Sequence, residues 1–192
     1  MHWIDPACLP EAKGTLTQFL LNPHGEPDGF ILDGQRQVHF PPHLGTHIAQ
    51  RVAPGDTVTV RGVRPRTANI IAAVSIAVDD GEPVVDEGPH RDDDRHERPE
   101  VETHAAEVTG TVMLSLHGPR GELRGALLDD GMSLRMPPHA AEELQAYLAP
   151  GARAQAWGDM VENTHGRTLD VSEIAEQADP GSAADADAGT DA

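Results

Sequence analysis

Three arginines, Arg61, Arg64 and Arg66, lie in one short segment between two β-rich runs. Guanidinium groups neutralise phosphates and so supply the sequence-independent part of nucleic-acid affinity. The corresponding segment later in the chain carries Asp159 and Glu162 and is acidic instead. If the protein binds nucleic acid, the first of these segments therefore makes the contact. The alternative is an ordinary solvated loop, since arginines near turns are common at protein surfaces.

The chain also has eleven histidines, which raises the question of a metal site. His43 and His47 lie four residues apart, as do His139 and Glu143, and this spacing places two ligands on one face of a helix. No third ligand recurs in both places, so we predict no structural metal. Weak binding of a transition metal by three histidines of an aspartate-rich segment is an alternative function: His90, His96 and His104.

Each of these helix-forming segments follows a Pro-Pro-His motif. Proline is favoured in the first turn of a helix, and a histidine there can bond free backbone groups. We therefore interpret the repeated motif as a structural corner rather than a ligand set. It consists of Pro41, Pro42 and His43 in the first place and Pro137, Pro138 and His139 in the second.

Catalytic chemistry has little support in the residues. Cys8 is the only cysteine and has no basic neighbourhood to lower its pKa, which also excludes an intramolecular disulfide. There is no glycine-rich phosphate loop and no metalloprotease helix motif. The recurring carboxylates border turns, where they can accept backbone hydrogen bonds: Glu26 with Glu122, and Asp33 with Asp129. We predict a protein that is not an enzyme and holds no cofactor.

The elements that must position these residues are duplicated. Residues 14–62 recur without a gap at a constant offset of 96. The shared residues are mostly turn formers and backbone specialists, so the duplication concerns a chain path. Those of the first copy are Gly14, Pro23, Gly25, Glu26, Gly29, Leu32, Asp33, Pro41, Pro42, His43, Pro54, Gly55 and Gly62.

Each copy predicts three strands, a helix and two strands. In the first, β-rich runs and turn signals indicate strands over 15–21, 29–32, 37–40, 57–61 and 70–78. Leu44, Ile48 and Val52 lie four apart, as in a short helix with one apolar face. The second copy has strands over 111–116, 125–128, 133–136, 154–157 and 168–174, with a helix stripe of Ala140, Leu144 and Leu148.

This order resembles the OB-fold, a five-stranded Greek-key barrel with its helix between strands three and four. The segment from Pro54-Gly55-Asp56 to Gly62 is similar to the entry into strand four of many OB domains. The Pro-Pro-His segments also resemble a group of uncharacterised bacterial proteins. We therefore predict a mostly β protein with two tandem five-stranded OB-like Greek-key barrels, each carrying one short helix.

Composition and charge divide the chain into five parts. We predict an N-terminal extension over 1–12, OB-like domains over 13–78 and 106–177, an acidic flexible linker over 79–105 and a disordered acidic tail over 178–192. Residues 1–78 carry six acids and six bases, whereas residues 79–105 carry eleven acids and three bases. The sequence shows no signal peptide and no long apolar run, so we expect a cytoplasmic protein.

OB barrels usually bind ligands across strands two and three. By alternation, the outward side of these strands carries Gln37 and His39 in the first copy, with Ile31 and Asp33. No aromatic residue lies on that predicted face, although stacking on aromatics is what holds single strands. Phe19 on the first strand is a candidate for such stacking, and its alternative is a core position.

The resemblance implies a non-catalytic binding protein, with single-stranded nucleic acid as the leading ligand through the first domain. The predicted contacts are Phe19, Gln37, His39, Arg61, Arg64 and Arg66. A protein-interaction or scaffolding module without nucleic-acid binding is the second interpretation, because the second copy is acidic and aromatics are few. No membrane partner is expected.

The predicted linker can be tested by limited proteolysis. Since residues 79–105 have no apolar pattern, a protease should cut there, at Arg91, Arg95 or Arg98, and leave two resistant fragments. Protection of these arginines equal to that of Arg36 and Arg51 would show instead that the segment is packed.

Overall fold

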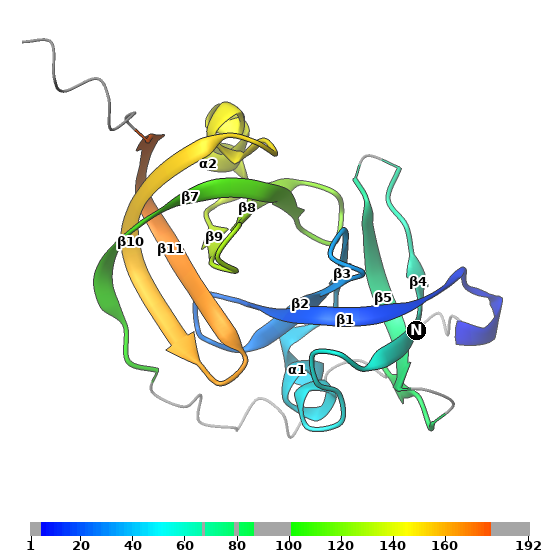
Figure 1. Cartoon of the computed structure of the whole chain (residues 1–192). Coiled ribbons are helices and arrows are strands. Elements are labelled where there is room, and N and C mark those ends of the chain that lie inside the picture. The colour runs from blue at the N-terminus through cyan, green and yellow to red at the C-terminus, as the bar shows by residue number, and fades with distance from the viewer. Residues whose placement is uncertain (1–4, 67, 79–80, 87–100, 178–192) are drawn as a thin grey trace, which may run out of the picture.

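Two closed five-stranded β-barrels make up the described part of the chain (Figure 1). The computed structural model describes residues 5–66, 68–78, 81–86 and 101–177. Each barrel has one short helix between its third and fourth strands. The fold class predicted from the duplicated strand order is therefore confirmed.

The first barrel is built from β1 to β5 in the order β3-β2-β1-β4-β5. It closes through a parallel pairing of β3 with β5, which places Val38 opposite Ile71. Its elements are η1 (Pro6–Cys8), β1 (Glu11–Leu21), β2 (Pro27–Leu32), β3 (Arg36–His39), α1 (Pro42–Ala49), β4 (Thr57–Val63) and β5 (Ile70–Val78), and β6 (Val84–Val85) adds to the edge of β5.

The second barrel repeats this topology and closes through the parallel pair β9 and β11. Its elements are β7 (His104–His117), β8 (Leu123–Leu128), β9 (Ser133–Arg135), α2 (Pro138–Glu143), η3 (Gln145–Leu148), β10 (Arg153–Asn163) and β11 (Gly166–Glu176). Its helix differs from the prediction, because the backbone leaves the α-helical path at Leu144 and continues as a 3-10 turn. Leu148 still reaches the core and is fully buried.

Alternating apolar side chains fill each barrel. In the first barrel, Phe30 of β2 and Val38 of β3 pack with Phe40, which follows β3. They contact Val58 and Val60 of β4, and all five side chains are buried. The second core has no phenylalanine among its buried residues; Met136 takes the place of Phe40, and Met132 is buried with it. Burial of such side chains, worth about 1.5–3 kcal/mol each, is what holds the strands in closed barrels.

Two pairs of duplicated glycines lie where strands approach too closely for a side chain. A Cβ on Gly29 would meet the carbonyl oxygen of Val38, and one on Gly125 would meet that of Leu134. Gly62 and Gly158 stand at bulges of β4 and β10 in the same relation to the neighbouring strand. The repeat therefore preserves these residues because barrel closure leaves no room for a Cβ.

The two barrels pack against each other through the outward faces of their β1–β2 and β7–β8 strands. Leu20 and Ile31 of the first barrel form one buried cluster with Leu116 and Leu127 of the second. These are equivalent positions, 96 residues apart, so the interface is a pseudo-two-fold contact of a repeated surface with itself. The side-chain amide of Gln37 adds two hydrogen bonds of 2.8 Å to the backbone N–H and carbonyl of His117.

Parts of the predicted linker belong to strands. Val84 and Val85 pair with β5, and β7 begins at His104, which lengthens the first strand of the second barrel toward its N-terminus. The predicted cleavage sites and the tail over 178–192 lie outside the described residues.

The interface cluster predicts that its buried leucines contribute strongly to the stability of the protein. Leu116 is fully buried, so Leu116→Ala should lower the free energy of unfolding by about 2–5 kcal/mol, measured by urea denaturation. On the same strand, Met113 is 56% exposed, and Met113→Ala should change stability by less than about 0.5 kcal/mol. Equal effects of the two substitutions would contradict the packing of the interface.

Candidate functional site

The predicted ligand-binding face of the first barrel is covered by the second barrel. Gln37 is only 4% exposed, and its side chain is bonded to the β7–β8 turn. The apolar residues of the same face are the reason, because Ile31 and its equivalent Leu127 leave water by packing face to face. The structure thus changes the expectation that a ligand binds across β2 and β3. A nucleic-acid strand cannot lie over these two β-strands while the barrels are packed.

Phe19 is also not accessible to a ligand. Its ring is buried in the first core, edge-on to Phe30 with centroids 6.4 Å apart. On the other side it meets His165 of the second barrel at 5.7 Å. Phe19 therefore occupies a position in the core and at the interface, and not one on an open ligand-binding face.

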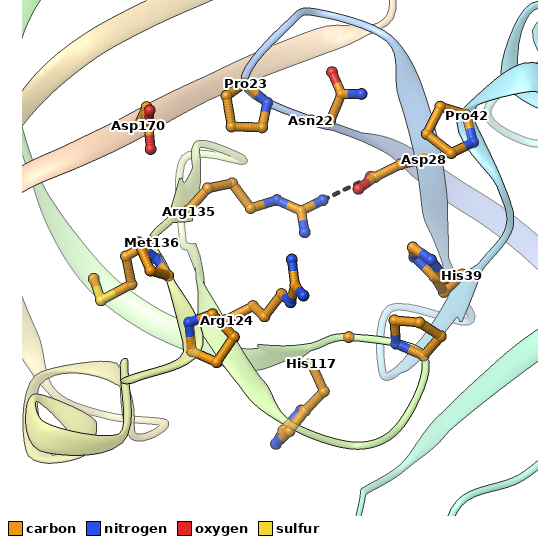
Figure 2. A pocket seen from close by; sticks show the side chains of 14 residues that line it. Asn22, Pro23, Asp28, His39, Pro42, His117, Arg124, Arg135, Met136 and Asp170 are labelled. Carbon is orange, nitrogen blue, oxygen red and sulfur yellow. Dashed lines mark hydrogen bonds and ion pairs between the residues drawn. The ribbon is translucent and has the colours of Figure 1, made fainter. Parts of the chain in front are cut away.

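A cavity of about 610 Å³ opens where the two barrels meet (Figure 2). Its lining follows the pseudo-two-fold relation, because many of the residues come as equivalent pairs from the two copies. The pairs are Asn22 with Gly118, Pro23 with Pro119, Asp28 with Arg124, His39 with Arg135, and Pro42 with Pro138. The structure thus places His39 at this cavity rather than on an open barrel face.

The charged members of these pairs differ between the copies. Asp28 accepts a hydrogen bond of 2.7 Å from Nη2 of Arg135, and the two side chains are only 11% and 8% exposed. Arg124 is held less firmly, by an Nε contact of 3.3 Å to Glu122 at the cavity rim. In Figure 2 both guanidinium groups extend into the same cavity.

Burial favours the neutral form of both histidines at the cavity. Burial lowers the pKa of His39, Asp28 opposes this shift, and the nearby Arg135 and Arg124 add to it. Burial also lowers the pKa of His117, against the effects of a Ser115 backbone hydrogen bond and Glu122. Hence these rings supply hydrogen-bonding groups, and not charge, to the lining.

Two further grooves lie on the outer faces of the barrels at related positions. The first, of about 500 Å³, runs over β1, β4 and β5, and its charged residues are Glu11, Lys13 and Arg61. The second, of about 470 Å³, runs over β7, β10 and β11 beside Trp157, and its charged residues are all acidic: Glu107, Asp159 and Glu173. The two copies therefore present the same surface with opposite charge.

Two of the three hairpin arginines contact Glu11 beside the first outer groove. Arg61 forms a 2.6 Å ion pair with Glu11, and Arg64 donates to the Glu11 carbonyl at 3.1 Å. Arg66 is exposed on the segment between β4 and β5. These contacts group the arginines at one end of β1, away from the buried β2–β3 face.

The Pro-Pro-His segments lie at the helix starts. Pro42 and Pro138 occupy the first residues of α1 and α2, and no side-chain hydrogen bond caps either helix. His43 does not bond the helix backbone as expected, but approaches Asp86 at 3.3 Å, while His139 is exposed. In the described residues no three histidine, cysteine or acidic side chains converge on one point.

Sequence reasoning missed Arg124 and Arg135 as site residues. The available signal was the exchange of Asp28 for arginine at the equivalent position, which places opposite charges on surfaces that meet.

Comparison with known proteins does not assign this chain to a family. No family model matches the chain, and no curated protein matches it. Two solved structures of the single-stranded DNA binding protein from Thermus aquaticus match it, the wild type with a TM-score of 0.29 and 13% identity and a deletion mutant with 0.28 and 14%. Each match covers 88% of this chain and 92% or 93% of the other. At such TM-scores the likeness carries no argument about function.

Within the described ranges, no helix has the length and apolarity needed to cross a membrane.

The buried histidine predicts a pH dependence of stability. The pKa of His39 is lowered in the folded state, so below about pH 6.5 the unfolded chain binds more protons and stability falls as the pH falls. His39→Gln should therefore reduce the loss of unfolding free energy between pH 7 and pH 5, measured by urea denaturation. His47→Gln, at an exposed position of α1, should leave the profile unchanged. A wild-type profile retained in His39→Gln would contradict the assignment.

Proposed function

We propose that this protein is a non-catalytic binding protein that takes single-stranded nucleic acid on the first barrel, along the outer groove over β1, β4 and β5 and at the β4–β5 hairpin. The observation that carries the proposal is the opposite charge of the two equivalent grooves. The first presents Lys13 and Arg61 beside Arg64, and Arg66 follows in the same hairpin. Within the described part of the chain, Glu11 is the only acidic residue of its lining.

The packing of the barrels limits how such a strand would bind. Because the β2–β3 faces meet each other, the usual OB contact surface is closed and Gln37 is not part of the proposed contact. Phe19 is buried, and no aromatic residue of the described ranges lines the first outer groove, so the proposal does not rely on base stacking there. The contact is with phosphates, and we expect modest affinity, tolerance of sequence and strong salt dependence.

The geometry also explains why only one copy is proposed to bind. In the second barrel Trp157 replaces Arg61, and three carboxylates line the groove. These carboxylates repel the negatively charged phosphate backbone at short range. Stacking on one aromatic ring does not offset this repulsion. That acidic groove with its half-buried tryptophan favours the alternative function, a surface for a basic protein segment.

The charge asymmetry can be tested on the full chain. Each phosphate neutralised on a single strand contributes about 0.7 to the slope of log affinity against log salt, so Arg64→Ala with Arg66→Ala should flatten the slope by about 1.4. The measurement is fluorescence anisotropy of a labelled oligonucleotide over a salt series. Affinity at low salt should fall in the same variant.

The matched control is Arg36→Ala with Arg51→Ala, which removes the same charge from the first barrel outside the groove. Binding by this control should stay close to that of the parent at every salt concentration. Absence of oligonucleotide binding at low salt would overturn the proposal, as would equal losses in the two double variants. Binding of a basic peptide that Glu173→Gln abolishes would then identify the second barrel as a protein-binding module.

A further inference from the structure

The cavity between the barrels contains a buried arginine that is not fully satisfied. Arg135 is 8% exposed, and Nη2 of its guanidinium group is bonded to Asp28. Its Nε is buried and has no hydrogen-bond partner in the described part of the chain. A buried charged donor without a partner is costly, and the ion pair with Asp28 offsets only part of that cost.

A second guanidinium group enters the same cavity. Arg124 contacts Glu122 through Nε, and its two terminal nitrogens make no hydrogen bond with the described residues. Figure 2 shows its guanidinium group extending toward that of Arg135, with His39 on the adjacent wall. Arg135 and Arg124 each act to lower the pKa of His39, although burial is the larger cause. Two guanidinium groups that reach one cavity can both engage a single anion bound there.

We propose that the cavity between the barrels is a binding site for a small molecule bearing a compact oxyanion, a phosphate monoester or a carboxylate, held between the guanidinium groups of Arg124 and Arg135. The planar guanidinium fork matches the geometry of both oxyanions. His39 and His117, on the same lining, supply neutral donors or acceptors for the remaining polar atoms of the ligand.

The size and remaining lining of the cavity define the rest of the ligand. A volume of about 610 Å³ lies within the range of roughly 300–1,000 Å³ that small-molecule sites occupy. The lining also includes apolar groups, chiefly Pro23, Pro119 and Met136, of which Met136 lies beside the arginines in Figure 2. The ligand is therefore larger than a bare phosphate and carries an apolar or planar part.

The lining also includes two carboxylates, Asp28 and Asp170, which have different surroundings. Asp28 is engaged by Arg135, and this ion pair holds the guanidinium group in position. Asp170 lies on the other side of the cavity from His39 in Figure 2. Burial raises the pKa of Asp170, Asp159 raises it further, and His24 opposes them. A ligand donor group on that side would match Asp170.

This site is separate from the proposed nucleic-acid groove. None of the hairpin arginines lines the cavity, and neither Arg124 nor Arg135 lines the outer groove. The site also needs both barrels, because Asp28 and His39 come from the first and the two arginines from the second.

The test uses the full chain and three probes, inorganic phosphate, adenosine monophosphate and citrate, titrated by calorimetry at constant ionic strength. Replacing Arg135 would leave Asp28 buried without its partner and could unfold the protein, so the variant is Arg124→Ala at a half-exposed position. It should weaken binding about ten- to hundredfold, the loss expected for a charge-assisted hydrogen bond. Arg120→Ala removes the same charge from an exposed residue of the neighbouring turn and should change affinity less than about twofold.

Each outcome decides the proposal. Adenosine monophosphate binding that depends on Arg124 supports a phosphate ligand, and citrate binding with the same dependence supports a carboxylate ligand. Arg64→Ala with Arg66→Ala should leave either one unchanged, which separates this site from the nucleic-acid groove. No binding of any probe at millimolar concentration overturns the proposal. Equal weakening by Arg124→Ala and Arg120→Ala also overturns it, since it would show diffuse attraction to surface charge.

Discussion

The apolar contact between the two barrels is the constraint on which the other features depend. Leu20, Ile31, Leu116 and Leu127 form one cluster, and its burial brings the outward faces of both barrels together. This contact covers the β2–β3 surface, orders Gln37 against the backbone of the second barrel and brings Asp28 within reach of Arg135. A polar face at these positions would leave two separate barrels with open ligand surfaces, whereas the apolar face produces one body with a cavity at its junction.

The polar positions around this cluster depart from the symmetry that the apolar ones keep. Equivalent residues in the two copies carry Asp28 and Arg124, and His39 and Arg135. The first copy therefore supplies a carboxylate and an imidazole, and the second supplies two guanidinium groups. Duplication alone would give a symmetric junction. Because the two copies differ at these positions, the charged groups of the cavity are arranged asymmetrically, with both arginines contributed by the second barrel.

The fold was predictable from the sequence because its determinants lie within each copy and recur in the other. Gly29 and Gly125 stand where β2 and β8 meet a neighbouring carbonyl, and Asp33 and Asp129 accept hydrogen bonds from the N–H groups of Thr15 and Thr111. Such residues act within their own barrel and can be found by comparing the copies. The split of the second helix at Leu144 was not predictable from spacing, since Leu148 keeps its buried position in either form.

The location of the site could not be predicted, because it depends on contacts between the barrels that residue spacing in the sequence does not indicate. Alternation identified the outward face of β2 and β3 correctly as a set of residues. It did not show that this face meets its own repeat, because packing between domains is set by surfaces far apart in the sequence. The buried ion pair joins positions 107 residues apart, and only the exchange of charge between the copies pointed to it.

The ion pair between Asp28 and Arg135 also determines which surfaces recognise each other. The contact faces of the two copies share their apolar centre, so a first barrel could meet another first barrel, or a second another second. A pair of first barrels would set Asp28 against His39 with no guanidinium group, and a pair of second barrels would bring four arginines together. Only the mixed pair places a carboxylate against a guanidinium group, so the duplicated chain favours association of unlike halves and disfavours oligomers of like ones.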